Sequence, residues 1–94
     1  MIRREDERLA LEGQITFATT ASVLEAAARE ARAGATVMDF AAVTDSDSSA
    51  LALTLELLRQ AEAEQRSICF TNMPDTLRKL AELYGLSEMI FQSR

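Results

Sequence analysis

Apolar and polar side chains alternate between Leu9 and Gly13, and this period of two predicts a half-buried strand. Gly13 predicts a turn, and residues 14–17 are expected to extend the same sheet briefly. Residues 35–40 are almost uncharged and partly β-branched, which predicts a central strand that is buried on both faces. Residues 67–71 have a similar character and predict a further strand.

Two helices are predicted between these strands. Ser22 and Glu25 have the spacing of a capping box, in which a hydroxyl and a carboxylate each bond to backbone N–H groups of the first turn. The first helix is therefore expected over residues 23–33, where alanine is frequent. The second helix is expected to begin within residues 45–49, which are rich in capping side chains, and to continue to about Glu64.

The second helix carries an apolar stripe that is wider than packing on one sheet face requires. One interpretation is that the helix packs on the sheet and also against a neighbouring helix. The other is that a partner protein covers part of the stripe. The stripe consists of Ala50, Leu51, Leu53, Leu55, Leu57, Leu58 and Ala61.

A third helix is predicted after the last strand. Pro74 stands in a first-turn position that proline tolerates, Gly85 ends the helix, and Leu86 is expected to fold back on the last turn. The apolar run 89–91 predicts either a short edge strand or a cap on the core. The order of strands and helices implies right-handed crossovers onto a largely parallel sheet, in a single domain expected over residues 1–94.

Charge and residue content exclude several classes of function. Ten Lys and Arg against fifteen Asp and Glu give a net charge of −5, which opposes nucleic-acid binding because that affinity depends on neutralising phosphates. The chain has no His and one Cys, so histidine acid–base catalysis, a His/Cys zinc site and an internal disulfide are excluded. The longest uncharged run, Gly13–Leu24, is threonine-rich and unsuited to a membrane span. We expect a soluble, cytoplasmic protein.

Carboxylates and hydroxyls are concentrated in residues 39–49. The segment lacks the turn glycine and distant glutamate of a calcium loop, and it offers no base to activate a serine. Its simplest role is structural, with Asp47 or Ser48 as the N-cap of the second helix. A hydroxyl at a helix N-terminus is also a place where an added phosphate is stabilised, which suits a switch. We predict no catalytic residue, no metal and no cofactor.

The chain resembles the STAS domain family at residues 38–40 (Met-Asp-Phe), 43–44 (Val-Thr) and 47–51 (Asp-Ser-Ser-Ala-Leu). In that family a buried strand and a loop lead to an Asp-Ser/Thr step that opens a helix. The opening Leu-x-Leu-x-Gly-x-Ile-Thr-Phe and the ending Pro-x-x-Leu-x-x-Leu-Ala-x-Leu-Tyr-Gly-Leu are similar to the MlaB-type branch. The resemblance implies a STAS-type α/β fold with a small, mixed, mostly parallel sheet of four to five strands and three or more helices.

The resemblance also implies a function. Members of the MlaB-type branch are cytoplasmic subunits that bind the ATPase of a phospholipid-transporting ABC complex, which maintains outer-membrane lipid asymmetry. The chain is accordingly expected to be a non-enzymatic adaptor, held at the inner membrane only through its partner, with no small-molecule substrate. The alternative is an anti-sigma-factor antagonist, whose partner is a serine kinase that also acts as the anti-sigma factor.

Residue by residue, Ser48 falls on the family's Ser/Thr, which is phosphorylated in the anti-sigma-factor antagonists and lies at the ATPase contact in the transporter branch. Asp47 falls on the preceding Asp, whereas Ala50 stands where many members have Gly. Docking is expected through residues 44–51, the adjoining edge of the second helix and the third helix, with Ser48 as the candidate phosphorylation site. The predicted partner-binding and switch residues are Thr44, Asp45, Asp47, Ser48, Ser49 and Leu51.

Overall fold

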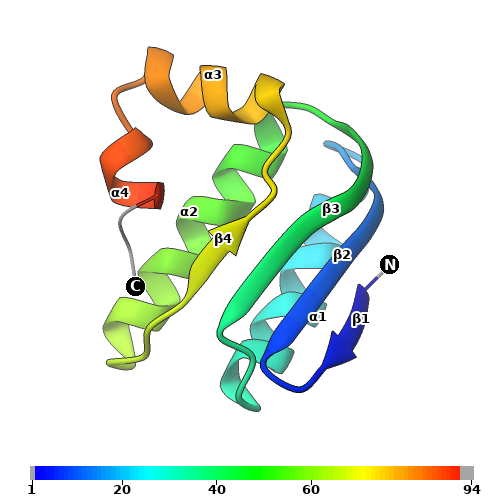
Figure 1. The fold of residues 1–94 in the computed structure, drawn as a ribbon, viewed down its shortest axis with the longest axis vertical. Coiled ribbons are helices and arrows are strands. Elements are labelled where there is room, and N and C mark those ends of the chain that lie inside the picture. Colours follow the sequence, from blue (N-terminus) through cyan, green and yellow to red (C-terminus); the bar gives the residue numbers. More distant parts are fainter. Residues whose placement is uncertain (1, 92–94) are drawn as a thin grey trace.

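Four strands form one mixed sheet in the order β1-β2-β3-β4 in the computed structural model, which describes residues 2–91 (Figure 1). The strands are β1 (Ile2–Glu5), β2 (Arg8–Ile15), β3 (Val37–Ser46) and β4 (Cys69–Thr71). The helices are α1 (Thr20–Arg32), α2 (Ser48–Ala63), α3 (Asp75–Leu83) and α4 (Ser87–Phe91). β1 is antiparallel to β2, whereas β2 with β3 and β3 with β4 are parallel. The predicted α/β class and mostly parallel sheet are confirmed.

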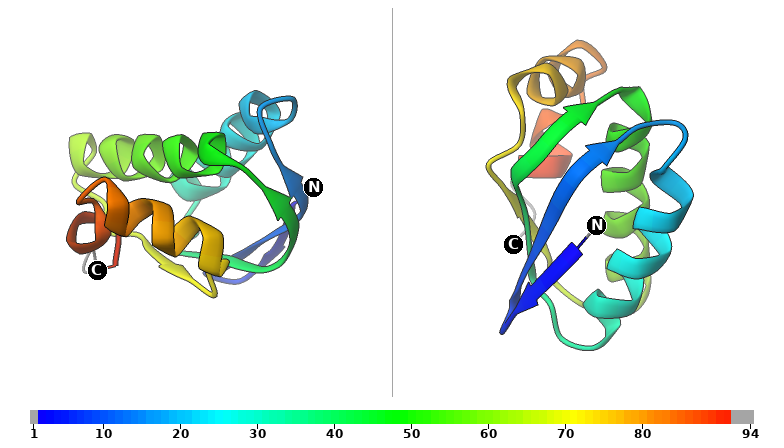
Figure 2. Two further views of the ribbon diagram at one scale, coloured as in Figure 1. Left: turned by 90° about the horizontal axis from the view of Figure 1, so that it is seen from above. Right: turned by 90° about the vertical axis from the view of Figure 1, so that its right-hand side faces the viewer.

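Helices α1 and α2 lie side by side on one face of the sheet, and the core lies between the helices and the sheet (Figure 2). Alternate side chains of β2 and β3 point into this core, and Leu9, Met38 and Phe40 are at most 1% exposed. The side chains between them face the other way, and Asp39 is only half-buried. The prediction that residues 35–40 are buried on both faces is therefore wrong.

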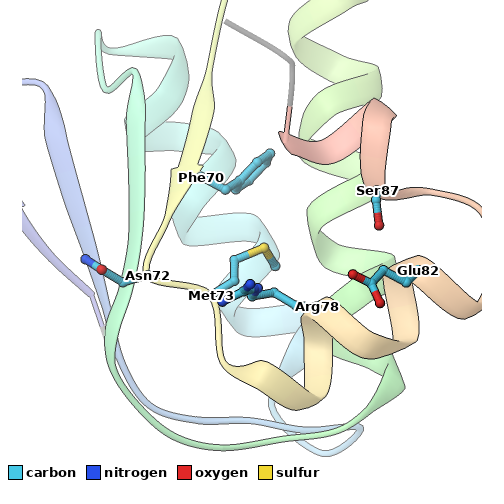
Figure 3. Close-up of a pocket in the computed structure, with 6 residues that line it drawn as sticks. All are labelled: Phe70, Asn72, Met73, Arg78, Glu82 and Ser87. Atoms are coloured by element: carbon cyan, nitrogen blue, oxygen red, sulfur yellow. The ribbon is translucent and has the colours of Figure 1, made fainter.

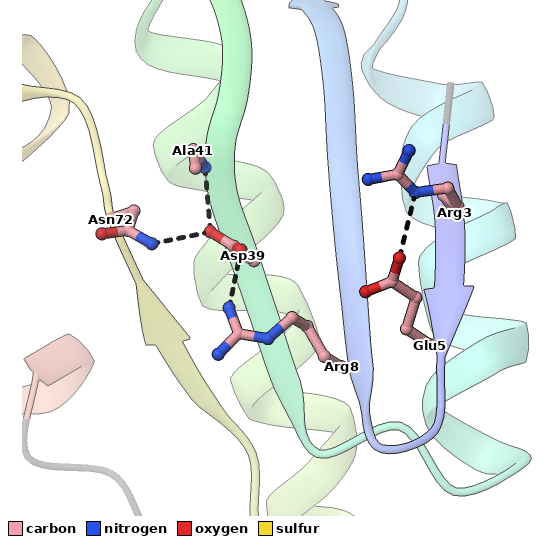
Figure 4. A network of polar contacts seen from close by, with 6 residues as sticks. All are labelled: Arg3, Glu5, Arg8, Asp39, Ala41 and Asn72. Atoms are coloured by element: carbon pink, nitrogen blue, oxygen red, sulfur yellow. Dashed lines mark hydrogen bonds and ion pairs between the residues drawn. The ribbon is translucent and has the colours of Figure 1, made fainter.

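A polar network joins three strands on the open face of the sheet (Figure 4). Arg8 on β2 donates to Asp39 on β3 at 2.6 Å, and the side-chain amide of Asn72, just after β4, donates to the same carboxylate at 3.0 Å. The Ala41 N–H donates to it at 2.9 Å. Burial acts to raise the pKa of Asp39, but these hydrogen bonds outweigh it and the pKa lies below its ordinary value. Through these hydrogen bonds Asp39 links β3 to β2 and to the segment that follows β4.

β3 continues past its predicted end at Phe40 as far as Ser46. The reason is the pairing of β3 with β2, which is also long and whose Ile15 lies opposite Ser46. Pairing with β2 therefore holds the last residues of β3 in a strand, although their composition favours a turn. Gly13 does not end β2 either. It lies within the strand with a φ of +83°, at a register irregularity, where glycine takes a conformation that other residues avoid.

Helix α1 begins at Thr20, earlier than the capping-box prediction. Its N-cap is Thr19, whose hydroxyl accepts from the Thr16 N–H at 2.9 Å. Ser22 and Glu25 both lie inside the helix and are exposed, so the predicted capping box is wrong. The hydroxyl of Thr19 thus fixes the turn that leads into this helix.

The C-terminal part follows the prediction closely. Pro74 is the N-cap of α3, and Gly85 follows its C-cap with a φ of +73°. The Leu86 N–H then donates to the Ala81 carbonyl at 2.7 Å, which folds the chain back on the helix. Ile90 is 1% exposed within α4, so this run caps the core and does not form an edge strand.

The wide stripe of α2 is covered within the molecule. Helix α1 packs beside α2, and α3 and α4 pack against it from the side of β4 (Figures 1 and 2). This confirms the first interpretation of the stripe, in which Leu55 alone is only partly buried, and it leaves no wide apolar flank as a candidate partner surface. The buried residues of α2 are Ala50, Leu51, Leu53, Thr54, Leu57, Leu58 and Ala61.

Candidate functional site

The carboxyl ends of β2 and β3 bring two connections together at one end of the sheet. Ile15 and Ser46 are opposite each other at the ends of these strands, and the Asp47 N–H donates to the Ile15 carbonyl at 3.4 Å. The β2–α1 and β3–α2 connections therefore start side by side (Figure 2). In parallel α/β sheets this edge is the usual place for recognition, because the connections that vary most meet there.

Asp47 joins the two connections. It is the N-cap of α2, and its Oδ1 accepts from the Ser49 N–H at 2.9 Å and from the Ser49 hydroxyl. Its Oδ2 accepts from the Phe17 N–H at 3.0 Å. These hydrogen bonds, the one from the Ser49 hydroxyl foremost, hold the pKa of Asp47 below its ordinary value. The predicted cap is confirmed, and Asp47 also ties the β2–α1 connection to α2.

The two serines that follow differ in accessibility. Ser48 is the first residue of α2 and is exposed, and its hydroxyl makes no hydrogen bond within residues 2–91. The Ser49 hydroxyl bonds to Asp47 and lies 2.7 Å from the Thr20 hydroxyl at the start of α1. Ser48 is therefore the hydroxyl that a partner or a modifying enzyme can reach, and Ser49 fixes the two helix ends relative to each other.

The remaining predicted site residues divide into surface and core. Thr44 and Asp45 are exposed at the end of β3 beside this cluster. Leu51 is only 4% exposed and packs in the core, so its assignment as a partner-contacting residue is corrected. Ala50 is fully buried, so the methyl group that replaces the family's frequent glycine points into this molecule.

An exposed aromatic residue next to this cluster was missed by the sequence reasoning. Phe17 is 89% exposed in the β2–α1 connection, although residues 14–17 were expected to extend the sheet. Its position directly before a threonine-rich helix start, just past the end of a parallel strand, is the signal that could have identified it. We define the switch surface as Phe17, Thr44, Asp45, Asp47 and Ser48.

A separate hollow of about 420 Å³ lies between β4, α3 and α4 (Figure 3). Glu82 and Ser87 project toward each other across it, and Met73 and Arg78 also line it. Arg78 forms an ion pair with Asp75 at 3.4 Å, so its positive charge is balanced within the protein. The Ser87 hydroxyl is buried and has no hydrogen-bond partner among the described residues. The hollow brings none of the predicted site residues together.

Residues 2–91 show neither a metal-binding cluster nor a membrane-spanning helix. The side chains described there include no group of three or more His, Cys, Asp or Glu that is arranged to hold a metal ion. Within the same range, no helix combines the length and the apolar character needed to cross a bilayer.

Comparison with known proteins gives one family match and several similar folds. A family model described as "Mlab, STAS domain" matches residues 1–91. The structure of the anti-sigma factor antagonist SpoIIAA in its unphosphorylated form is 20% identical, with a TM-score of 0.70, and the match covers 97% of this chain and 84% of that one. No sequence among the curated proteins matches the chain.

Two further structures extend this comparison. The phosphorylated form of the Bacillus cell fate determinant SpoIIAA is 21% identical with a TM-score of 0.66, over 97% of this chain and 87% of that one. A crystal structure of Mglu is 26% identical with a TM-score of 0.57, over 78% of this chain but only 19% of that one. At these identities the two SpoIIAA structures show a shared fold.

Proposed function

The chain belongs to the STAS domain family, in its MlaB-type branch, and on that premise we propose that it is a non-enzymatic adaptor. Its partner is the ATPase subunit of a phospholipid-transporting ABC complex, on the cytoplasmic side of the inner membrane. It docks through the switch surface and thereby favours assembly or the active state of the transporter. The family match over residues 1–91 is the observation that carries this proposal.

The local chemistry of the switch surface supports this use. Ser48 is exposed at the start of α2 and its hydroxyl makes no hydrogen bond within the described chain, so a partner can bond to it without breaking a hydrogen bond inside the protein. The position lies at the N-terminus of a 16-residue helix, which favours a polar group of the partner. The Asp47 hydrogen bonds fix the surrounding backbone, so binding requires little ordering.

The test is copurification of the ATPase with Ser48→Glu and Ser48→Arg variants. Both substitutions enlarge an exposed side chain, and we expect each to abolish copurification while the isolated domain keeps its thermal midpoint within a few degrees. Ser67→Glu and Ser67→Arg are the matched controls, because Ser67 is exposed in the connection between α2 and β4. Unchanged copurification with both Ser48 variants contradicts the proposal.

The second candidate is an anti-sigma-factor antagonist that is switched by phosphorylation. The fold similarity to SpoIIAA and the accessible Ser48 hydroxyl favour it. A phosphate on Ser48 would add about −1.5 to −2 charges next to Asp45 and Asp47, and so repel an acidic partner surface. Mass spectrometry of the protein from its own cells, with phosphate at Ser48, would favour this candidate, as would neighbouring genes for a serine kinase and a sigma factor.

A further inference from the structure

We propose that Phe17 is the apolar anchor of the switch surface and inserts its ring into an apolar pocket of the ATPase, a proposal that rests on the proposed function. A single exposed apolar side chain is ordinary on a protein surface and means little by itself. Two observations set Phe17 apart. It adjoins Ser48 through the Asp47 hydrogen bond, and its backbone is held in place on both sides.

The connection that carries Phe17 is fixed by several hydrogen bonds. The Thr16 N–H donates to the Thr19 hydroxyl at 2.9 Å, and that hydroxyl lies 3.0 Å from the Gln14 carbonyl. The Phe17 N–H donates to Asp47, which is itself fixed as the cap of α2. The ring is therefore presented from a backbone that is already ordered, and docking it costs little additional conformational entropy.

The residues around Phe17 indicate the chemistry of the partner surface that its ring contacts. Asp45 and Asp47 are exposed beside Ser48, and the hydrogen bonds that lower the pKa of Asp47 stabilise its charged form. A complementary partner surface has an apolar pocket for Phe17 and, at its rim, a Lys or Arg facing these carboxylates. An aromatic residue in a pocket, surrounded by polar contacts, is the arrangement in which a few residues supply most of the binding energy.

Titration of the purified ATPase with Phe17 variants, by calorimetry, tests the proposal. Phe17→Ala keeps the backbone N–H that bonds to Asp47, and the ring is exposed, so the fold should be unaffected. We expect its affinity to fall by about tenfold or more. Phe17→Trp, which restores an aromatic ring, should bind within a few-fold of the unmodified protein. The control Met89→Ala removes a side chain that is 57% exposed on α4, and its affinity should change by less than about twofold.

The outcomes distinguish a failure of the Phe17 anchor proposal from a failure of the proposed adaptor function. If Phe17→Ala binds normally while the Ser48 variants do not, the anchor role is wrong and the adaptor function stands. If the ATPase binds neither the unmodified protein nor any variant, the proposed function itself fails. If Met89→Ala loses as much affinity as Phe17→Ala, the apolar contact is not specific to the switch surface and the proposal is overturned.

Discussion

Leu51→Ala tests whether the residue at the edge of the switch surface acts through the core or through a partner. Leu51 is 4% exposed, and removing a buried leucine side chain to alanine lowers the free energy of unfolding by roughly 2–5 kcal/mol. A 94-residue domain has about 5–14 kcal/mol in total, at roughly 0.05–0.15 kcal/mol per residue. We therefore expect the thermal midpoint to fall by about 10 °C or more, with the fold retained at low temperature.

Urea unfolding followed by circular dichroism measures this loss, and Leu83→Ala is the matched control. Leu83 is 75% exposed, so the same substitution there should change the free energy of unfolding by less than about 0.5 kcal/mol. Binding to the ATPase, measured well below the midpoint of Leu51→Ala, should match that of the unmodified protein. A fully folded Leu51→Ala protein that fails to bind would refute the reasoning, because it would make Leu51 a contact residue.

Two further predictions concern α2. Thr54 is fully buried and its hydroxyl donates to the Ala50 carbonyl within the same helix at 3.0 Å, so Thr54→Val should change the free energy of unfolding by less than about 1 kcal/mol, and a urea-measured loss above about 2 kcal/mol would contradict this. Hydrogen bonds from Arg59, and then Gln60, lower the pKa of Glu56 to about 2. Its stabilising contribution should therefore be complete above pH 4.5 and disappear as the pH falls toward 2, and a carboxyl NMR titration with an ordinary midpoint would contradict this.

The elements that have a clear local sequence pattern were predictable from the sequence. Alternation marked β2, and the Pro74 and Gly85 signals located α3 within a residue or two. The length of β3 was not predictable, because residues 41–46 are held as a strand by pairing with β2. β1 was missed for the same reason. Its charged residues have weak strand preference, and they form a strand only because a tight turn at Asp6 places them against β2.

The central residues of the candidate site were predictable from the sequence, but the full set of its residues was not. The Asp47 cap and the exposed Ser48 follow from capping chemistry and from the family resemblance. The role of Phe17 depends on two parallel strands ending side by side, and residues 30 positions apart in the chain come together only in the folded state. Leu51 was misassigned because it lies within the family-like segment 44–51, although the apolar stripe of the second helix already placed it on the core side.

The central claim is that the carboxyl end of the sheet is a protein-docking surface. Its most direct test is an NMR titration of the isotopically labelled chain with the purified ATPase, followed at each backbone amide. We expect the amides of residues 16–20 and 45–50 to shift or broaden while those of residues 64–68, in the connection between α2 and β4, stay unchanged. Perturbation confined to residues 64–68 or to α3 and α4, with Phe17 and Ser48 unaffected, would contradict the claim.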